Sequence, residues 1–223
     1  MAAPAEFVHA LDEQARSALL ALGHARTAHP GEVLMSEGEP ADSVLVLVAG
    51  RVKVTVSTGS GATAVLAFRG PGALLGEHSA LDGSPRGATV TAIEPVDYVA
   101  MAASRFRRHL RESPDTAIAL ITHVGAHLRY ADRRRAEHLA GDTSARVAAR
   151  LVELADQYGV PEGAHVRIEL PLTQSELAGW SGSSLEAVAK ALRTLRTAGW
   201  LETGRREMTL RDVEALRRLA AAG

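Results

Sequence analysis

Apolar residues come in short alternating blocks between Gly31 and Met101, and from Ser104 onward they recur at helical spacing. Glycines or prolines separate almost all of the blocks, as expected for short antiparallel strands. We therefore expect a small β-barrel or sandwich of about eight strands, followed by helices. The blocks are Val44–Val48, Val52–Val56, Ala64–Phe68, Ala88–Ala92 and Asp97–Met101. An opening helix is predicted over Phe7–Leu22, and Gly76–Gly83 could hold one helical turn.

A long helix is predicted after the strands, because Pro114 suits a first helical turn and the apolar spacing continues to about Leu139. Its apolar seam keeps the 4,3 spacing of a coiled coil. A long helix with one narrow apolar seam needs a partner, and we expect a second copy of the chain in a parallel homodimer. Packing of the seam against the barrel is the alternative. The seam residues are Ala117, Ile121, Val124, Leu128 and Ala131.

The last third of the chain has the pattern of two short helices around a glycine turn. Thr173 with Glu176 three residues later is a capping-box signature for the first helix, and Gly199 suits the position after the second. Gly182 lies in the turn between them, and Trp180 is expected in the core. The flanking expectations are a hinge at Gly141, a helix over Ala145–Tyr158, a strand over His165–Leu170 and a hairpin wing over Leu201–Leu210. This order predicts a winged helix-turn-helix.

Composition excludes several other classes of protein. The 223 residues contain no Cys, which removes disulfides, thiolate zinc sites and Cys nucleophiles. No apolar run approaches the roughly 18 residues of a membrane helix, and the start Met-Ala-Ala-Pro-Ala-Glu lacks the features of a signal peptide. We therefore expect a cytoplasmic protein with no membrane partner. The sequence shows no paired catalytic carboxylates and no nucleophile–base constellation, so we do not expect an enzyme.

The strand-rich segment, the long helix and the winged helix-turn-helix, in this order, resemble the Crp/Fnr superfamily of bacterial transcription regulators. This superfamily includes proteins similar to the cyclic-AMP receptor protein. The landmarks of the resemblance are Glu37–Glu39, Val48–Val52, Gly72–Glu77, Pro85-Arg86, Leu172–Ala178 and Ser184–Leu192. It implies an α+β fold with an N-terminal cyclic-nucleotide-binding-type β-barrel (jelly roll) at residues 1–114. A dimerisation helix and hinge would occupy 115–141, and a C-terminal winged helix-turn-helix DNA-binding domain 142–223.

The function implied by the resemblance is a homodimeric regulator that binds a palindromic operator in double-stranded DNA under control of a small-molecule effector. RNA polymerase is a candidate partner. Two alternatives stay open at this point. The chain could be an effector-independent DNA-binding regulator with a degenerate sensor barrel, or a sensor module that controls a protein partner.

Charge is distributed unevenly in the DNA-reading part. The formal net charge of the chain is −1, but residues 190–211 carry six basic residues against two acidic ones. This local basic patch fits either a phosphate-binding surface or a solvated helix face. The phosphate contacts implied by the resemblance are the basic side chains Arg193, Arg196, Arg205 and Arg206, with Thr173 and Gln174 at the N-terminus of the first helix.

The second helix of the pair carries the residues expected to read bases, starting at Ser184. By resemblance, Glu186 and Lys190 fall at base-contacting positions, where Glu can accept from a cytosine amino group and Lys can donate to guanine. A Glu186–Lys190 salt bridge on a solvated helix is the alternative. Leu185 stands where some family members carry an Arg. Since leucine offers no donor and can only touch a thymine methyl group, the operator should differ from theirs.

An effector site is implied by residues that match the phosphate-binding cassette of the family. Gly76 would let backbone amides approach a phosphate, Glu77 would accept the ribose 2′-hydroxyl and Arg86 would neutralise the phosphate. Cyclic AMP or cyclic GMP is therefore a candidate effector. The family has Ser or Thr after the Arg, whereas this chain has Gly87, and losing that hydrogen bond predicts roughly 10- to 150-fold weaker binding or a different ligand.

Three further residues complete this predicted effector site. His78 and Ser79 follow in the cassette loop, and Asp132 is expected to face the base from the long helix. Pairing of Asp132 with Arg129, Arg133 or Arg135 is the alternative for that residue. For the cassette as a whole, the alternative is a structural Glu77–Arg86 ion pair without a ligand. His123 and His127 have the i,i+4 spacing of two zinc ligands, but no third ligand is evident nearby, so no metal site is predicted.

Overall fold

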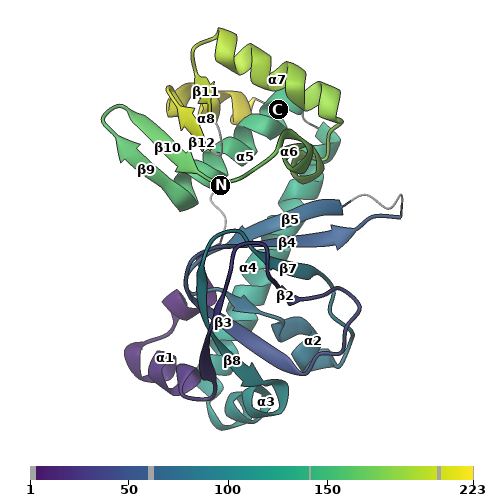
Figure 1. The fold of residues 1–223 in the computed structure, drawn as a ribbon, viewed down its shortest axis with the longest axis vertical. Helices are drawn as coiled ribbons and strands as arrows, with labels where there is room; N and C mark the ends of the chain where they lie inside the picture. The colour runs from purple at the N-terminus through teal and green to yellow at the C-terminus, as the bar shows by residue number, and fades with distance from the viewer. Residues whose placement is uncertain (1–3, 60–62, 141, 205–206, 223) are drawn as a thin grey trace. The chain divides into compact units, whose positions relative to one another are not determined.

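The computed structural model describes residues 4–59, 63–140, 142–204 and 207–222, with the backbone alone for 137–140. They form two compact units, one over Pro4–His127 and one from Leu128 onward (Figure 1). The hinge predicted at Gly141 lies outside the described residues.

The first unit is built on eight strands in two four-stranded antiparallel sheets, ordered β1-β8-β3-β6 and β2-β7-β4-β5 within the described residues. The predicted barrel or sandwich of about eight strands is therefore confirmed. The strands are β1 (His24–Ala28), β2 (Val33–Met35), β3 (Ser43–Ala49), β4 (Val52–Ser57), β5 (Thr63–Arg69), β6 (Leu74–Leu75), β7 (Thr89–Ala92) and β8 (Val96–Ala102).

Strand β3 is apolar from Val44 to Ala49, and both of its faces are buried from Val44 to Leu47. Leu45 and Leu47 pack into the core that also holds residues of the second sheet, such as Val52 and Val90. The alternate residue Val46 packs into a different core, together with helical residues. Successive side chains of a strand point to opposite faces, so a strand between two cores needs apolar residues at every position.

The opening stretch is not the single helix that the sequence predicts. A 3-10 helix, η1 (Phe7–Ala10), is followed by α1 (Glu13–Leu20), and Leu11 between them is extended. The break comes from Asp12, whose carboxylate accepts a 2.7 Å hydrogen bond from the backbone N–H of Ala15. Aspartate at this position caps a new helix in preference to continuing an old one. The other helices before the long one are α2 (Glu77–Asp82) and α3 (Ala103–Glu112).

The long helix α4 (Pro114–Ala140) begins at the predicted proline. The predicted seam is wrong at Val124, which packs against the core together with the buried Leu120. Among the side chains of α4 that the structure describes, the large apolar ones left exposed are Ile118, Ile121 and Leu128, at 61%, 72% and 61% exposure. Ile118 was missed because periodicity alone does not fix the phase of a seam along a helix that has two apolar faces.

The second unit contains the predicted helix-turn-helix and wing together with two elements that were not predicted from the sequence, β9 and α8. Its described elements after α4 are α5 (Thr143–Tyr158), β9 (Gly159–Glu162), β10 (His165–Glu169), α6 (Gln174–Ser181), α7 (Leu185–Thr197), β11 (Leu201–Thr203), β12 (Glu207–Leu210) and α8 (Val213–Ala221). The four strands form one antiparallel sheet in the order β11-β12-β10-β9. Among the described helices of both units, none is long and apolar enough to cross a membrane.

Candidate nucleic-acid interface and effector site

The first helix of the pair begins with the predicted capping box. The hydroxyl of Thr173 accepts from the backbone N–H of Glu176 at 3.1 Å, and the Glu176 carboxylate accepts from the backbone N–H of Thr173 at 2.8 Å. The Thr173 hydroxyl also donates to that carboxylate at 2.9 Å. The side chain of Thr173 is therefore committed to the cap, while the neighbouring Gln174 is exposed.

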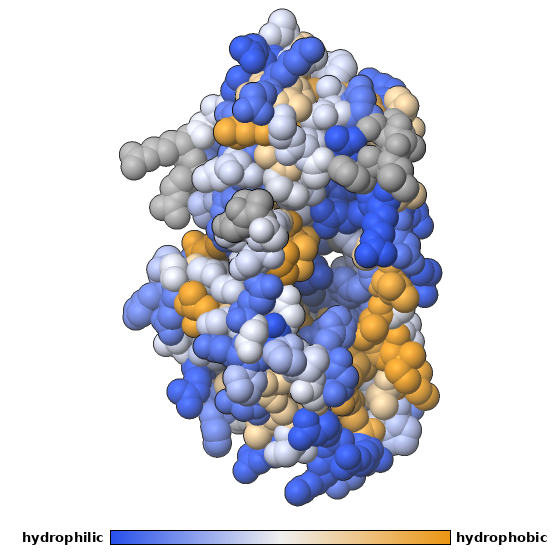
Figure 2. Space-filling view, turned by 90° about the vertical axis from the view of Figure 1, so that its right-hand side faces the viewer, coloured by the Kyte–Doolittle hydropathy of each residue, from blue (hydrophilic) through white to orange (hydrophobic). Residues whose placement is uncertain are grey.

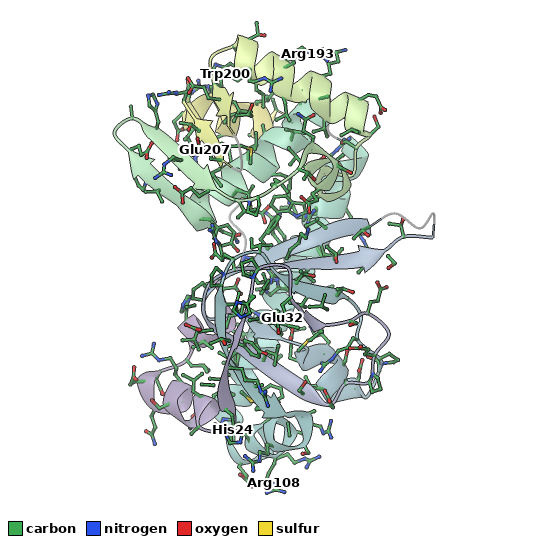
Figure 3. The ribbon with its side chains drawn as sticks, in the orientation of Figure 1. His24, Glu32, Arg108, Arg193, Trp200 and Glu207 are labelled. Atoms are coloured by element: carbon green, nitrogen blue, oxygen red, sulfur yellow. The ribbon has the colours of Figure 1, made fainter. Side chains whose placement is uncertain are left out.

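Helix α7 presents one apolar and one polar face. Val188, Leu192 and Leu195 are buried, which fixes the helix on the unit. The opposite face exposes Leu185, Glu186, Lys190 and Arg193, and Figure 3 shows Arg193 on the outer side of the helix. Ser184 caps the helix, because its hydroxyl accepts from the backbone N–H of Ala187 at 3.2 Å. The side chains predicted to read bases thus lie together on one accessible face.

Glu186 and Lys190 do not form the salt bridge that was the alternative interpretation of their spacing. Within the described residues no ion pair joins them, and both side chains are exposed. The pKa of Glu186 lies below its usual value, because its own backbone N–H and the Ser184 side chain hydrogen-bond to the carboxylate. An ionised carboxylate at the start of α7 can accept hydrogen bonds but cannot donate them.

The predicted phosphate contacts differ in their surroundings. Arg193 is exposed, whereas Arg196 donates from Nη1 to the hydroxyl of Thr203 on β11 at 3.1 Å. Arg196 therefore links α7 to the first strand of the wing. Arg205 and Arg206 lie outside the described residues, so their role stays a prediction.

In the first unit the cassette begins at a glycine that no other residue could replace without strain. Gly76 follows β6 with a φ of 80°, in the left-handed region. A Cβ atom there would lie 2.4 Å from Nη1 of Arg86 and 2.7 Å from Cε of Met35. The close approach lets Nη1 of Arg86 donate to the Gly76 carbonyl at 3.1 Å. Glycine is required here because the arginine side chain crosses over it.

Arg86 is buried and is held chiefly by the backbone. Its Nη2 donates to the carbonyl of Ser43 at 2.7 Å and lies 3.1 Å from the Ser43 hydroxyl. Its ion pair is with Asp42, at 3.5 Å, and not the Glu77–Arg86 pair of the alternative interpretation. Asp42 and Ser43 come from the start of β3, and no sequence motif pointed to them.

Glu77 is largely buried, and this burial raises the pKa of its carboxyl group. The nearby charges of His78, Arg69 and Arg86 lower the pKa, but their effect is smaller than that of burial. His78 is exposed, with Nε2 3.5 Å from the Glu77 carboxylate. His78 and Ser79 lie in α2 and not in a loop; Ser79 is buried and donates its hydroxyl to the carbonyl of Pro85 at 3.0 Å, which ties α2 to the segment before Arg86.

The remaining predicted effector residues are exposed. Gly87 is exposed, and a Cβ atom there would have no neighbour within 4 Å. Space for a serine side chain is therefore available directly after Arg86. Asp132 is exposed on the part of α4 that belongs to the second unit, and its contact with an effector stays a prediction.

Two histidines of α4 and an arginine of β5 form a polar cluster in the first unit. The rings of His123 and His127 pack edge to face with centroids 4.4 Å apart, and Nη2 of Arg69 lies 3.2 Å from Nδ1 of His127. Burial and the charge of Arg69 lower the pKa of both histidines, that of His127 to about 3. His127 is thus neutral at neutral pH, and its Nδ1 accepts from the guanidinium. The described residues contain no group of three or more His, Asp or Glu side chains that could hold a metal ion.

Comparisons with known proteins agree with both halves of this arrangement. Residues 25–113 match the cyclic nucleotide-binding domain, and residues 145–219 match the Crp-like helix-turn-helix domain. The chain is 32% identical over 190 residues to the CRP-like cAMP-activated global transcriptional regulator of Mycobacterium tuberculosis, covering 85% of each protein. It is 27% identical to the cyclic AMP receptor protein of Thermus thermophilus, again over 190 residues and 85% of each protein.

The fold is shared with solved structures. The structure of FixK2 from Bradyrhizobium japonicum has a TM-score of 0.77 at 24% identity, over 90% of this chain and 98% of that one. Two domain matches in the expected order, and identity above 30% along most of the chain, identify the relationship. The chain belongs to the Crp/Fnr superfamily, a family of transcription regulators and not of enzymes.

Proposed function

We propose that the protein is a homodimer that reads a palindromic operator with the exposed face of α7 from each copy, under control of a small-molecule effector held by the barrel. The observation that carries this proposal is the face of α7 itself. Its apolar side is buried, its N-terminus is capped, and Glu186, Lys190 and Arg193 are exposed together. A helix of this kind enters the major groove with its N-terminal residues against base edges. The site of action would be the cytoplasm, where the DNA is.

Dimerisation is supported by the exposed apolar residues of α4. Ile118, Ile121 and Leu128 are spaced three and seven residues apart, which places them on one side of the helix. Apolar surface also gathers along one edge of the molecule in Figure 2. Burying an exposed apolar face of this kind against another protein surface is favourable, and a second copy of the chain supplies an identical face for it to pack against. Two-fold symmetry then requires operator half-sites about one helical turn apart, or a multiple of it.

A cyclic nucleotide is the effector class that we propose. Support comes from the match to the cyclic nucleotide-binding domain, from Gly76, Glu77 and Arg86 in the cassette, and from a relative that is described as cAMP-activated. Without a hydroxyl at residue 87, the affinity should be lower than that of a cassette with Ser or Thr by roughly one to two orders of magnitude.

A second candidate is a regulator that binds DNA without an effector. It is favoured by the hydrogen bonds of Arg86, which already joins the carbonyls of Ser43 and Gly76. RNA polymerase as a partner is proposed only from the family resemblance.

Two measurements test the proposal. Selection of duplexes from a random-sequence pool should recover a two-fold symmetric site, and sedimentation should show a dimer at micromolar concentration. Calorimetric titration with cyclic AMP and cyclic GMP then separates the two candidates. Recovery of an asymmetric site by a stable monomer would contradict the proposal.

A further inference from the structure

The last turn of α6 leads into the tight turn before α7, and its carbonyl groups need hydrogen-bond donors. A helix leaves its last four carbonyls without partners inside the helix. The turn itself supplies donors to three of them. Gly182, with a φ of 61°, donates its N–H to the carbonyls of Ala178 and Gly179, and the Ser183 hydroxyl donates to the carbonyl of Ser181 at 3.3 Å. The carbonyls of Trp180 and Ser181 also accept from donors outside the turn.

Two arginines from other helices supply these donors. Arg134 of α4 donates from Nη2 to the carbonyl of Trp180 at 2.6 Å. Arg146 of α5 donates from Nε to the carbonyl of Ser181 at 3.0 Å and from Nη2 to the hydroxyl of Ser183 at 3.0 Å. Positive charge at the C-terminal end of a helix is favourable in addition to the hydrogen bonds. The turn of the helix-turn-helix is therefore fixed by side chains that lie outside it.

The surroundings of Trp180 hold Arg134 in this position. The Trp180 side chain is buried, as the sequence predicts, and the Cζ atoms of Arg134 and Arg150 lie 5.8 Å and 5.7 Å from the centroid of its ring. Arg150 is itself buried, with an ion pair to Glu153 at 2.8 Å and a hydrogen bond to the Tyr130 hydroxyl at 2.9 Å. Arg134, already packed against this ring, therefore loses little further freedom when it binds the turn.

We infer that Arg134 and Arg146 are positioning residues for DNA binding, which hold the turn from which α7 starts without reading the DNA themselves. The inference rests on the proposed function. Ser183, which Arg146 contacts, is followed directly by Ser184, the cap of α7, and Glu186 lies within the first turn after it. A displacement of the turn therefore displaces the base-contacting side chains. Arg134 also lies on α4, the helix of the proposed dimer contact, so it joins that helix to the turn.

A phosphate contact is the competing role for any arginine in a DNA-binding unit, and salt dependence separates the two. Each cation that neutralises a phosphate contributes about 0.9 to the slope of log affinity against log salt. A positioning residue changes the affinity and leaves this slope unchanged.

The test uses the full-length protein and a duplex that the wild type has selected from a random-sequence pool. Arg134→Gln and Arg146→Gln should each weaken binding of this duplex about tenfold or more, with an unchanged salt slope. Arg134→Lys retains a cation and a donor and should recover part of the affinity. Arg146→Lys should not, because lysine cannot reproduce a fork with donors on two nitrogens. The matched control is Arg217→Gln, since Arg217 pairs with Asp156 and Glu214 in the same unit and should leave binding unchanged.

A circular-dichroism melt of each variant shows whether it is folded at the temperature of the binding measurement. Affinities are compared only below the melting transition. If Arg146→Gln does not fold, Ser183→Ala replaces it, because it removes the hydroxyl that Arg146 contacts without changing any charge. It should weaken binding a few-fold at an unchanged slope. If Arg134→Gln does not fold, Arg134→Lys replaces it. Wild-type affinity in the folded variants, or a slope reduced by about 0.9, would overturn the inference. A wild type that binds no duplex would overturn the proposed function, and the inference with it.

Discussion

At the scale of single residues, Glu186 separates base reading from general attraction to DNA. We expect Glu186→Ala to relax specificity at one base pair in each half-site, by about 1–3 kcal/mol, because the carboxylate would accept a hydrogen bond from one base. Arg193→Ala should weaken all duplexes alike and reduce the salt slope by about 1. Selected-site profiles of the two variants measure the difference. An unchanged profile for Glu186→Ala would show that the base-reading residues are misassigned.

The residue after Arg86 tests the effector site. Gly87→Ser should tighten cyclic-nucleotide binding by about an order of magnitude or more, because the added hydroxyl can hold the phosphate and its Cβ atom meets no neighbour within 4 Å. Arg86→Ala should abolish binding and lower the melting temperature, because the carbonyls of Ser43 and Gly76 lose a donor. Calorimetric titration of the three proteins with cyclic AMP and cyclic GMP gives the answer. Absence of binding to wild type and Gly87→Ser at millimolar ligand would contradict a cyclic-nucleotide effector.

The cassette shows how far a sequence can predict such a site. Gly76 and Arg86 were predicted because their spacing matches a family motif, and the structure brings them into contact. Asp42 and Ser43 were not predicted, because the folding of the sheets brings them to Arg86 from more than forty residues away in the chain. Nothing in the local sequence marks such a partner. Arg69 was not predicted either, because it contacts His127 from 58 residues away in the chain.

At the scale of elements, α4 should be sensitive to a charge on its exposed apolar face. We expect Ile121→Glu to shift the protein from dimer to monomer, because two buried carboxylates would face each other across the proposed contact. Thr122→Glu, at an exposed polar position one residue further along α4, serves as the control for added charge. Analytical ultracentrifugation distinguishes the two. A dimer that survives Ile121→Glu would place the contact elsewhere.

The packing of α4 against the strands of the first unit should weaken in acid, because His127 is neutral in the folded protein and becomes protonated on unfolding. The folded pKa of His127 is about 3, below its ordinary value of 6.5, so the folded state binds fewer protons than the unfolded state between these values. The contribution of this histidine is therefore present above about pH 6.5 and is lost progressively as the pH falls toward 3. Melting temperatures at pH 7.5 and 5.5 should differ less in His127→Asn than in the wild type. His24→Asn, at an exposed histidine of β1, should keep the wild-type difference, and an equal loss in both variants would contradict this assignment.

At the scale of the whole molecule, the order of its parts was predictable, and two elements, β9 and α8, were missed for different reasons. The change from strand blocks to helical spacing separated the barrel from the helices after it. Strand β9 carries Gly159 and Pro161 in four residues, so it has no alternating signal, and it forms by pairing with β10. Strand β9 therefore depends on a contact that forms only in the folded protein. Helix α8 does carry a local signal, because Asp212 caps it and Ala215 and Leu216 lie on one buried face, so the sequence could have revealed it.

The boundary between the two compact units lies within α4, after His127, and Arg134 belongs to the same unit as the turn that it holds. This placement restricts how such a regulator can acquire a new DNA target by genetic recombination. A crossover near residue 142 would join the turn of one parent to the Arg134 position of the other, and the carbonyl of Trp180 would depend on a foreign residue for its donor. A crossover before residue 128 would transfer the turn together with both arginines. Exchange between relatives should therefore be best tolerated when the breakpoint falls in the long helix before residue 128.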